Sequence, residues 1–121
     1  MTTQPALLVV DDDPNYRELI VIVGRTRGIV VLEAADCGQA LQMLDREKDR
    51  IRLILLDYFM PGMEPTQCAA AVIAKAGPSI PIILATAAMD PAGRAAELRL
   101  REWLSKPFDI AVLEALFQKV A

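Results

Sequence analysis

The sequence of 121 residues predicts one doubly wound α/β domain, residues 1–121, with a parallel sheet between two layers of helices. Short runs of aliphatic residues without polar alternation are typical of strands that are buried on both faces. These runs alternate with segments whose apolar residues recur at helical spacing, which is the pattern of βαβ units. The length is sufficient for one domain with its own hydrophobic core.

The first strand is expected at Leu7–Val10, and three aspartates, residues 11–13, follow it. Asp13 and Pro14 form a typical N-cap and N1 pair, so a helix should begin here. Gly24 and Gly28 mark its end. The residues at helical spacing on its apolar face are Tyr16, Leu19, Ile20 and Val23.

Ile29–Leu32 is a shorter apolar run that turns polar at Glu33, as in an edge strand. Asp36 then begins the second helix, with an inward face formed by Ala40, Leu41 and Leu44.

The third strand is Leu53–Leu56, four consecutive aliphatic residues followed at once by Asp57. Pro65 and Thr66 begin an alanine-rich helix, and Gly77-Pro78 end it.

Pro81–Ala85 is the fourth strand and leads into residues 86–88, after which Asp90-Pro91 cap a helix that reaches about Leu100. Trp103-Leu104 form a brief fifth strand. Asp109 caps the last helix, whose shared face is formed by Ile110, Leu113, Phe117 and Val120. Five strands and five helices in strict alternation fit the flavodoxin-like sheet order 2-1-3-4-5.

Composition excludes several functions. The net charge of −3 and the lack of a basic stripe argue against direct binding of nucleic acid. The chain has no histidine, which excludes His-based triads, His metal sites and a role as a phosphohistidine donor. Residues 1–5 do not resemble a signal peptide, and the uncharged run at residues 76–89 is too short to cross a membrane. The chain is expected to end with its last helix, without an output domain.

Cys37 and Cys68 have neither CxxC nor metal-ligand spacing. We therefore interpret both as small buried or half-buried residues in a reducing cytosol, and we expect a cytoplasmic protein.

Chemistry-bearing residues follow four of the predicted strands. Asp57 alone could merely terminate its strand, and Thr86 and Lys106 could be a turn cap and a surface lysine. In a parallel sheet, however, the carboxyl ends of the strands meet at one edge, where such folds bind their ligands. The residues expected there are Asp11, Asp12, Asp57, Thr86 and Lys106, whereas Asp13 is better explained as a helix cap.

Three carboxylates at one edge repel one another. At ~4 Å and an effective dielectric constant of 20, each pair costs ~4 kcal/mol, so a cation or shared protons must offset the repulsion. Oxygen ligands without His or Cys suit Mg²⁺, and Lys106 and Thr86 suit phosphoryl oxygens. The residues therefore predict a pocket for a phosphoryl group beside a divalent metal.

Four motifs carry a resemblance to a known family: Val9-Val10-Asp11-Asp12, Leu56-Asp57 with Met60-Pro61-Gly62, Ala85-Thr86-Ala87, and Lys106-Pro107-Phe108. In this order and at this spacing, they resemble the response-regulator receiver domain of two-component signalling over essentially the whole chain.

The resemblance implies that Asp57 accepts a phosphoryl group from phosphohistidine on a sensor histidine kinase or a histidine phosphotransfer protein. It also implies that Mg²⁺ is held by Asp12, Asp57 and the backbone carbonyl of Phe59, with Asp11 acting through water. Thr86, the amide of Ala87 and Lys106 would hold the phosphoryl oxygens. Lys106-Pro107 would be a cis peptide. The domain would act as a switch and would not turn over an external substrate.

In such a switch, phosphorylation would alter the surface of the fourth helix, fifth strand and fifth helix, which would meet an unknown output partner or support a phosphorylation-dependent dimer. Trp103 stands where receivers carry an aromatic residue that moves inward with the threonine. Equally, Trp103 could simply pack an edge strand.

Two alternatives stay open from the sequence. A haloacid-dehalogenase-like phosphatase would use Asp11 as its nucleophile, although its usual later acid pair and cap domain are not visible. An interaction module that keeps the fold but needs no phosphorylation is the other.

The chain departs from the receiver pattern at two loop positions and lacks polar side chains at two others. Pro65 and Arg99 stand where receivers commonly have glycine. Phe59 and Ala88 cannot orient a hydrolytic water, which predicts slow loss of the phosphoryl group.

Overall fold

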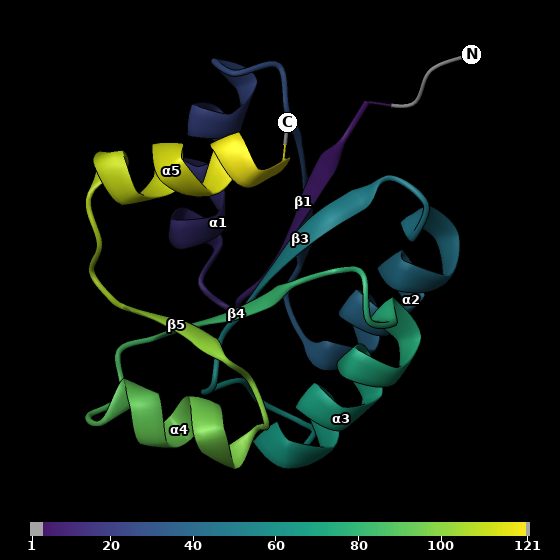
Figure 1. The fold of residues 1–121 in the computed structure, drawn as a ribbon, viewed down its shortest axis with the longest axis vertical. Coiled ribbons are helices and arrows are strands. Elements are labelled where there is room, and N and C mark those ends of the chain that lie inside the picture. The colour runs from purple at the N-terminus through teal and green to yellow at the C-terminus, as the bar shows by residue number, and fades with distance from the viewer. Residues whose placement is uncertain (1–3, 121) are drawn as a thin grey trace.

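The computed structural model describes residues 4–120 and has a five-stranded parallel sheet in the order β2-β1-β3-β4-β5, as predicted (Figure 1). The strands are β1 (Ala6–Val10), β2 (Val30–Ala34), β3 (Ile51–Leu56), β4 (Ile82–Thr86) and β5 (Glu102–Ser105). The helices are α1 (Pro14–Arg25), α2 (Cys37–Glu47), α3 (Pro65–Ala76), α4 (Pro91–Glu97) and α5 (Ile110–Val120).

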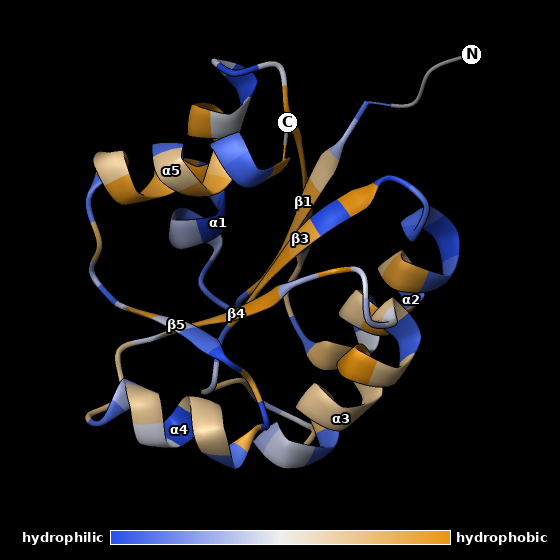
Figure 2. Ribbon diagram, viewed as in Figure 1, coloured by the Kyte–Doolittle hydropathy of each residue, from blue (hydrophilic) through white to orange (hydrophobic). Residues whose placement is uncertain are grey.

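Helices cover both faces of the sheet, with α1 and α5 on one side and α2, α3 and α4 on the other (Figure 1). Alternate residues of β1 serve the two faces: Leu7 and Val9 pack with α1 and α5, whereas Leu8 and Val10 pack with α2 and α3. The strands β1 and β3 are accordingly apolar along most of their length (Figure 2). This double burial explains why their sequences lack polar alternation.

The predicted aspartate caps are confirmed. Each carboxylate accepts a hydrogen bond from a backbone amide in the first turn of its helix. The amide nitrogens lie 2.9 Å (Asn15 to Asp13), 2.8 Å (Gln39 to Asp36), 3.1 Å (Gly93 to Asp90) and 3.1 Å (Val112 to Asp109) from the accepting oxygens.

Two residues predicted to face inward lie on the surface instead. Leu19 is 43% exposed and Ile110 is 54% exposed. The buried side chains of α5 are Leu113, Leu116, Phe117 and Val120. Both exceptions lie near the margin of an apolar stripe, where helical spacing alone does not decide burial.

Helix α4 is shorter than predicted, because it ends at Glu97 and not near Leu100. Arg99 has φ +62°, and the amide of Leu100 then bonds back to the carbonyl of Ala95 at 2.8 Å. This reversal buries both Leu98 and Leu100 in the core below the helix. Leu98 and Leu100 are therefore buried by the loop that follows α4, and they do not extend the helix by a further turn.

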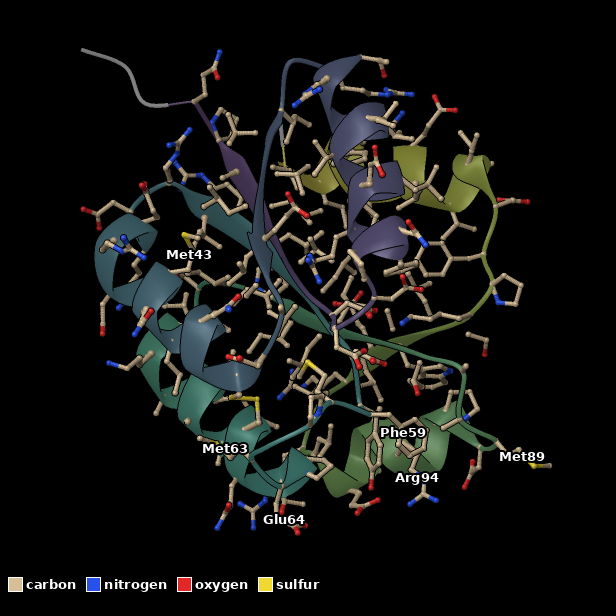
Figure 3. All side chains as sticks on the ribbon, turned by 180° about the vertical axis from the view of Figure 1, so that it is seen from behind. Met43, Phe59, Met63, Glu64, Met89 and Arg94 are labelled. Atoms are coloured by element: carbon tan, nitrogen blue, oxygen red, sulfur yellow. A yellow bond between two sulfur atoms is a disulfide. The ribbon has the colours of Figure 1, made fainter. Side chains whose placement is uncertain are left out.

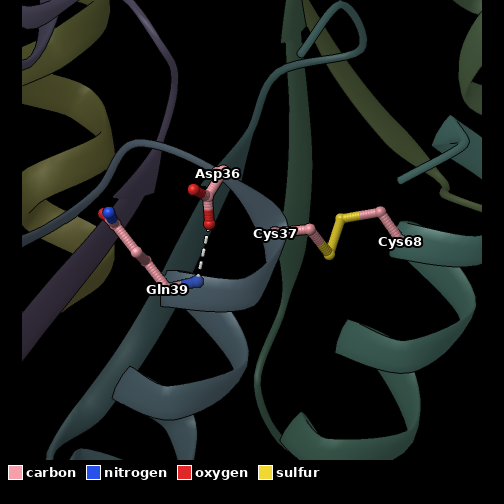
Figure 4. The surroundings of a disulfide bond; sticks show 4 residues. All are labelled: Asp36, Cys37, Gln39 and Cys68. Carbon is pink, nitrogen blue, oxygen red and sulfur yellow. Dashed lines mark hydrogen bonds between the residues drawn. A yellow bond between two sulfur atoms is a disulfide. The ribbon is translucent and has the colours of Figure 1, made fainter. Parts of the chain in front are cut away.

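Cys37 and Cys68 are both buried, as expected, but they form a disulfide bond and are not free thiols (Figure 4). The bond joins the first residue of α2 to the first turn of α3, across 31 residues of sequence and a Cα–Cα distance of 5.9 Å. The two helices pack side by side, so residues without recognisable spacing in sequence become neighbours. The cysteines therefore no longer support the expectation of a reducing compartment.

None of the helices that the structure describes is long and apolar enough to cross a membrane. The residues on which the signal-peptide prediction depends include 1–3, which lie outside the described part of the chain.

Candidate functional site

Three aspartates meet at the carboxyl edge of the sheet. The Asp57 amide bonds to the Val10 carbonyl at 3.0 Å, which keeps β3 beside β1 up to this residue. One carboxylate oxygen each of Asp11, Asp12 and Asp57 lies within 4.8 Å of the others. Asp11 and Asp57 are buried and Asp12 is exposed. The sheet therefore brings together the acids predicted from the strand ends.

Lys106 reaches the same cluster from the loop after β5. Its ammonium forms an ion pair with Asp11 and lies 3.5 Å from Oδ1 of Asp57. The side chain of Lys106 is only 16% exposed. Its backbone amide donates to the carbonyl of Thr86 at 2.9 Å, and the Lys106-Pro107 peptide is cis.

Thr86 ends β4 and is fully buried. Its hydroxyl accepts a hydrogen bond of 3.0 Å from the amide of Ala88. Thr86 and Ala87 thus lie at the predicted edge, with the hydroxyl engaged inside its own loop.

The surroundings of Asp57 disfavour the ionised form of its carboxyl group. Burial raises the pKa of its carboxyl group from 3.8 to about 6, Lys106 opposes this shift, and Asp11 adds to it. Burial also raises the pKa of the Tyr16 hydroxyl, with further contributions from the charges of Asp11 and Asp57. The Lys106 ammonium therefore does not offset the cost of burying the ionised Asp57 carboxylate.

The donor set fits a hard divalent cation. Three convergent carboxylates supply oxygen ligands, and no histidine exists in the chain to compete for a softer metal. A cation of the size and charge of Mg²⁺ would stabilise the ionised form of Asp57, which burial and, to a smaller extent, the charge of Asp11 disfavour.

Two further residues singled out in the sequence lie at the surface. Phe59 is 55% exposed and forms a T-shaped contact with Tyr58, with ring centroids 5.0 Å apart. Arg94 of α4 also lies against the Tyr58 ring, and Figure 3 labels both Phe59 and Arg94. Trp103 on the edge strand β5 is 44% exposed. Its proposed inward movement stays a prediction.

Sequence reasoning missed three residues that support the cluster. The Tyr16 ring lies against Lys106, with 4.2 Å from Nζ to the ring centroid. Arg17 donates to the carbonyl oxygen of Asp11 at 2.6 Å. Tyr58 bonds to Glu97 of α4. Tyr16 and Arg17 lie in the first helical turn after the three aspartates, residues 11–13. This proximity to the acids was the feature of the sequence that could have indicated their contacts with the cluster.

Comparisons with known proteins agree with the fold. A model of the response regulator receiver domain matches residues 7–118. An uncharacterized 14.6 kDa protein of Leptolyngbya boryana is 34% identical over 96% of this chain and 89% of its own length. The transcriptional regulatory protein GlrR of Escherichia coli is 33% identical over 99% of this chain, which spans only 26% of GlrR.

Solved structures give the same result. The chemotaxis protein CheY4 of Vibrio cholerae superposes with a TM-score of 0.82 and 26% identity, covering 98% of this chain and 100% of CheY4. The response regulator TrrA of Thermotoga maritima, in complex with Mg²⁺ and BeF, gives 0.79 and 27%, covering 98% and 100%. The chain belongs to the family of response regulator receiver domains.

Proposed function

We propose that Asp57 is the phosphoacceptor of a two-component phosphorelay. The observation that supports this assignment best is the convergence of Asp11, Asp12 and Asp57 within 4.8 Å, with Lys106 3.5 Å from Asp57. Asp57 Oδ would attack the phosphorus atom as the P–N bond of a ring-protonated phosphohistidine breaks, giving an acyl phosphate on Asp57 and a neutral imidazole that keeps its proton on the donor.

Magnesium fits the acid cluster. Asp12, Asp57 and the backbone carbonyl of Phe59 would hold it, with Asp11 acting through water. When bound, Mg²⁺ neutralises charge on the transferred group. Similarity to TrrA, whose structure contains Mg²⁺ and BeF, supports this choice.

Lys106, Thr86 and the Ala87 amide would hold the phosphoryl oxygens. Lys106 is already beside Asp57, so it needs little movement. The Thr86 hydroxyl now accepts from the Ala88 amide, and it would turn to donate to a phosphoryl oxygen. This exchange links the chemistry to the β4–α4 loop.

The biological role that follows is a switch. A phosphoryl group adds roughly −1.5 to −2 charges beside Lys106 and Thr86 and would favour a second packing of the surface formed by α4, β5 and α5. The phosphodonor would be a sensor histidine kinase or a histidine phosphotransfer protein. The switched surface would meet an output partner or a second copy, in the cytoplasm, without turnover of an external substrate.

The test is intact mass spectrometry after incubation with acetyl phosphate and MgCl₂. We expect wild-type protein to gain one phosphoryl group and Asp57→Asn to gain none. Asp13→Asn is the matched control, because Asp13 caps α1 and lies outside the acid cluster. Failure of the wild type to label would instead support a phosphorylation-independent interaction module.

The same variants separate the receiver from a haloacid-dehalogenase-like phosphatase. In the structure, one carboxylate oxygen of Asp11 accepts from the Asp13 amide at 3.0 Å and the other pairs with Lys106. These bonds make Asp11 a poor nucleophile. Turnover of small phosphate esters that is lost in Asp11→Asn but kept in Asp57→Asn would favour the phosphatase.

A further inference from the structure

Tyr16 contacts the loop that carries Lys106 with two parts of its ring. The ring face lies under the Lys106 ammonium, 4.2 Å from centroid to Nζ. The same ring meets Phe108 in a T-shaped arrangement, with centroids 5.9 Å apart and planes at 79°. One side chain of α1 thus contacts two residues of the Lys106-Pro107-Phe108 segment.

We propose that Tyr16 is a positioning residue for phosphoryl transfer, whose ring face holds the Lys106 ammonium against Asp11 and Asp57. This proposal rests on the proposed role of Lys106 in that reaction. A cation within about 6 Å of an aromatic centroid is attracted by the ring, more strongly where water is excluded. Lys106 meets both conditions, because its Nζ lies 4.2 Å from the Tyr16 centroid and its side chain is only 16% exposed.

The charges around Lys106 favour an uncharged group as the further contact of its ammonium. A further carboxylate against the ammonium would add to the repulsion among the acids, whereas an aromatic face attracts the ammonium and brings no net charge. The ammonium is thereby shared between the Asp11 carboxylate, Asp57 and the Tyr16 ring. It would remain near Asp57 even when Mg²⁺ competes for the carboxylates.

The hydroxyl of Tyr16 helps to separate this role from an ordinary hydrogen bond. It is buried and has no hydrogen-bond partner within the described residues 4–120. The hydroxyl therefore makes no hydrogen bond to Lys106, and whatever Tyr16 adds to the two carboxylates in holding the ammonium comes from its ring. Ordinary core packing against Phe108 explains the T-shaped contact but not the ammonium above the ring face.

Three variants test the proposal. Tyr16→Leu removes the ring, Tyr16→Phe keeps it and removes only the hydroxyl, and Phe117→Leu is a matched control within the same apolar cluster. We expect Tyr16→Leu to slow phosphorylation by acetyl phosphate about 2- to 30-fold, the range that corresponds to one cation–π contact. Tyr16→Phe should restore the rate to within about twofold of wild type.

A double-mutant cycle distinguishes positioning from general destabilisation. In a Lys106→Met background, Tyr16→Leu should slow the residual labelling no further, because the ammonium that it positions is gone. An equal slowing in both backgrounds would overturn the proposal. Absence of labelling in the wild type would instead refute the proposed function, so the two failures are distinct.

NMR gives a readout that needs neither phosphoryl donor nor metal. The Lys106 side-chain protons above the ring should be shifted upfield in wild type and Tyr16→Phe and return towards ordinary lysine values in Tyr16→Leu. This holds even if Tyr16→Leu folds poorly, because the wild-type shift is itself the test. Ordinary shifts in the wild type would contradict the proposal.

Discussion

The hydroxyl of Tyr58 donates a 3.0 Å hydrogen bond to Oε1 of Glu97 and so joins the residue next to Asp57 to helix α4. Arg94 completes the contact: its guanidinium lies 5.1 Å from the centroid of the Tyr58 ring and 3.2 Å from the Glu97 carboxylate. The network spans from the proposed phosphorylation site to the surface that the proposed switch would alter.

Tyr58→Phe should therefore lower the free energy of unfolding by about 1 kcal/mol, the typical loss for one hydrogen bond. Urea unfolding followed by fluorescence of Trp103, the single tryptophan, measures it. In a cycle with Glu97→Ala, the two losses should not add, since both remove the same bond. Fully additive losses would show that the bond contributes nothing.

Arg99 is strained by its backbone. Its φ of +62° lies in the left-handed region, which costs a residue with a Cβ roughly 1–2 kcal/mol. The buried neighbours Leu98 and Leu100 hold it there. We expect Arg99→Gly to raise the free energy of unfolding by about 1 kcal/mol, since Gly accepts positive φ. Arg101→Gly, a nearby exposed change, should not stabilise; equal effects of the two would refute the strain.

The disulfide should be a main contributor to stability. It closes a 31-residue separation, for which the chain-entropy estimate is about 3–4 kcal/mol. Reduction should lower the urea midpoint of the wild type and leave a Cys37→Ala/Cys68→Ala double variant unchanged. Two reactive thiols in the unfolded, unreduced protein would show that the bond is absent in solution.

These cases indicate how far sequence reasoning reaches. The strands and caps follow from local signals, because double burial removes polar alternation and aspartates precede the helices. The sheet order and the acid cluster follow from the fit of the alternating elements to a known fold, in which the strand ends converge. The disulfide does not, since Cys37 and Cys68 meet only through the packing of α2 on α3. The contact of Tyr16 with Lys106 is likewise a matter of side-chain placement across 90 residues, which no spacing encodes.

The raised pKa of Asp57 predicts a specific pH dependence of stability without metal. The folded protein holds this proton up to about pH 6, whereas the unfolded chain releases it near 3.8. The contribution of Asp57 to the free energy of unfolding therefore falls between about pH 4 and pH 6 and stays low above that range. Asp57→Asn should be more stable than wild type at pH 8 by roughly 2 kcal/mol, with little difference at pH 3.5.

Adding MgCl₂ at pH 8 is the control for this prediction. Ligand binding to the folded state alone raises its stability, so wild type should gain on Asp57→Asn as the concentration increases. Two results would contradict this prediction. One is equal stability of wild type and Asp57→Asn at pH 8 without metal, and the other is a wild-type stability that does not change when Mg²⁺ is added.

The lifetime of the phosphoryl group depends on side chains at the rim of the site. Phe59 and Ala88 stand two residues after Asp57 and Thr86, and neither has a polar atom to orient water. Purified phosphoprotein should therefore lose its phosphoryl group slowly, and loss within seconds would be inconsistent with this view.

Phe59→Asn should accelerate the loss on the order of tenfold, by placing an amide where water can be oriented. Because Phe59 is 55% exposed, the change should leave folding intact. Phe59→Leu, which adds no polar atom, should retain the slow decay; equal acceleration would mean that the ring shields the acyl phosphate and that water orientation is not limiting.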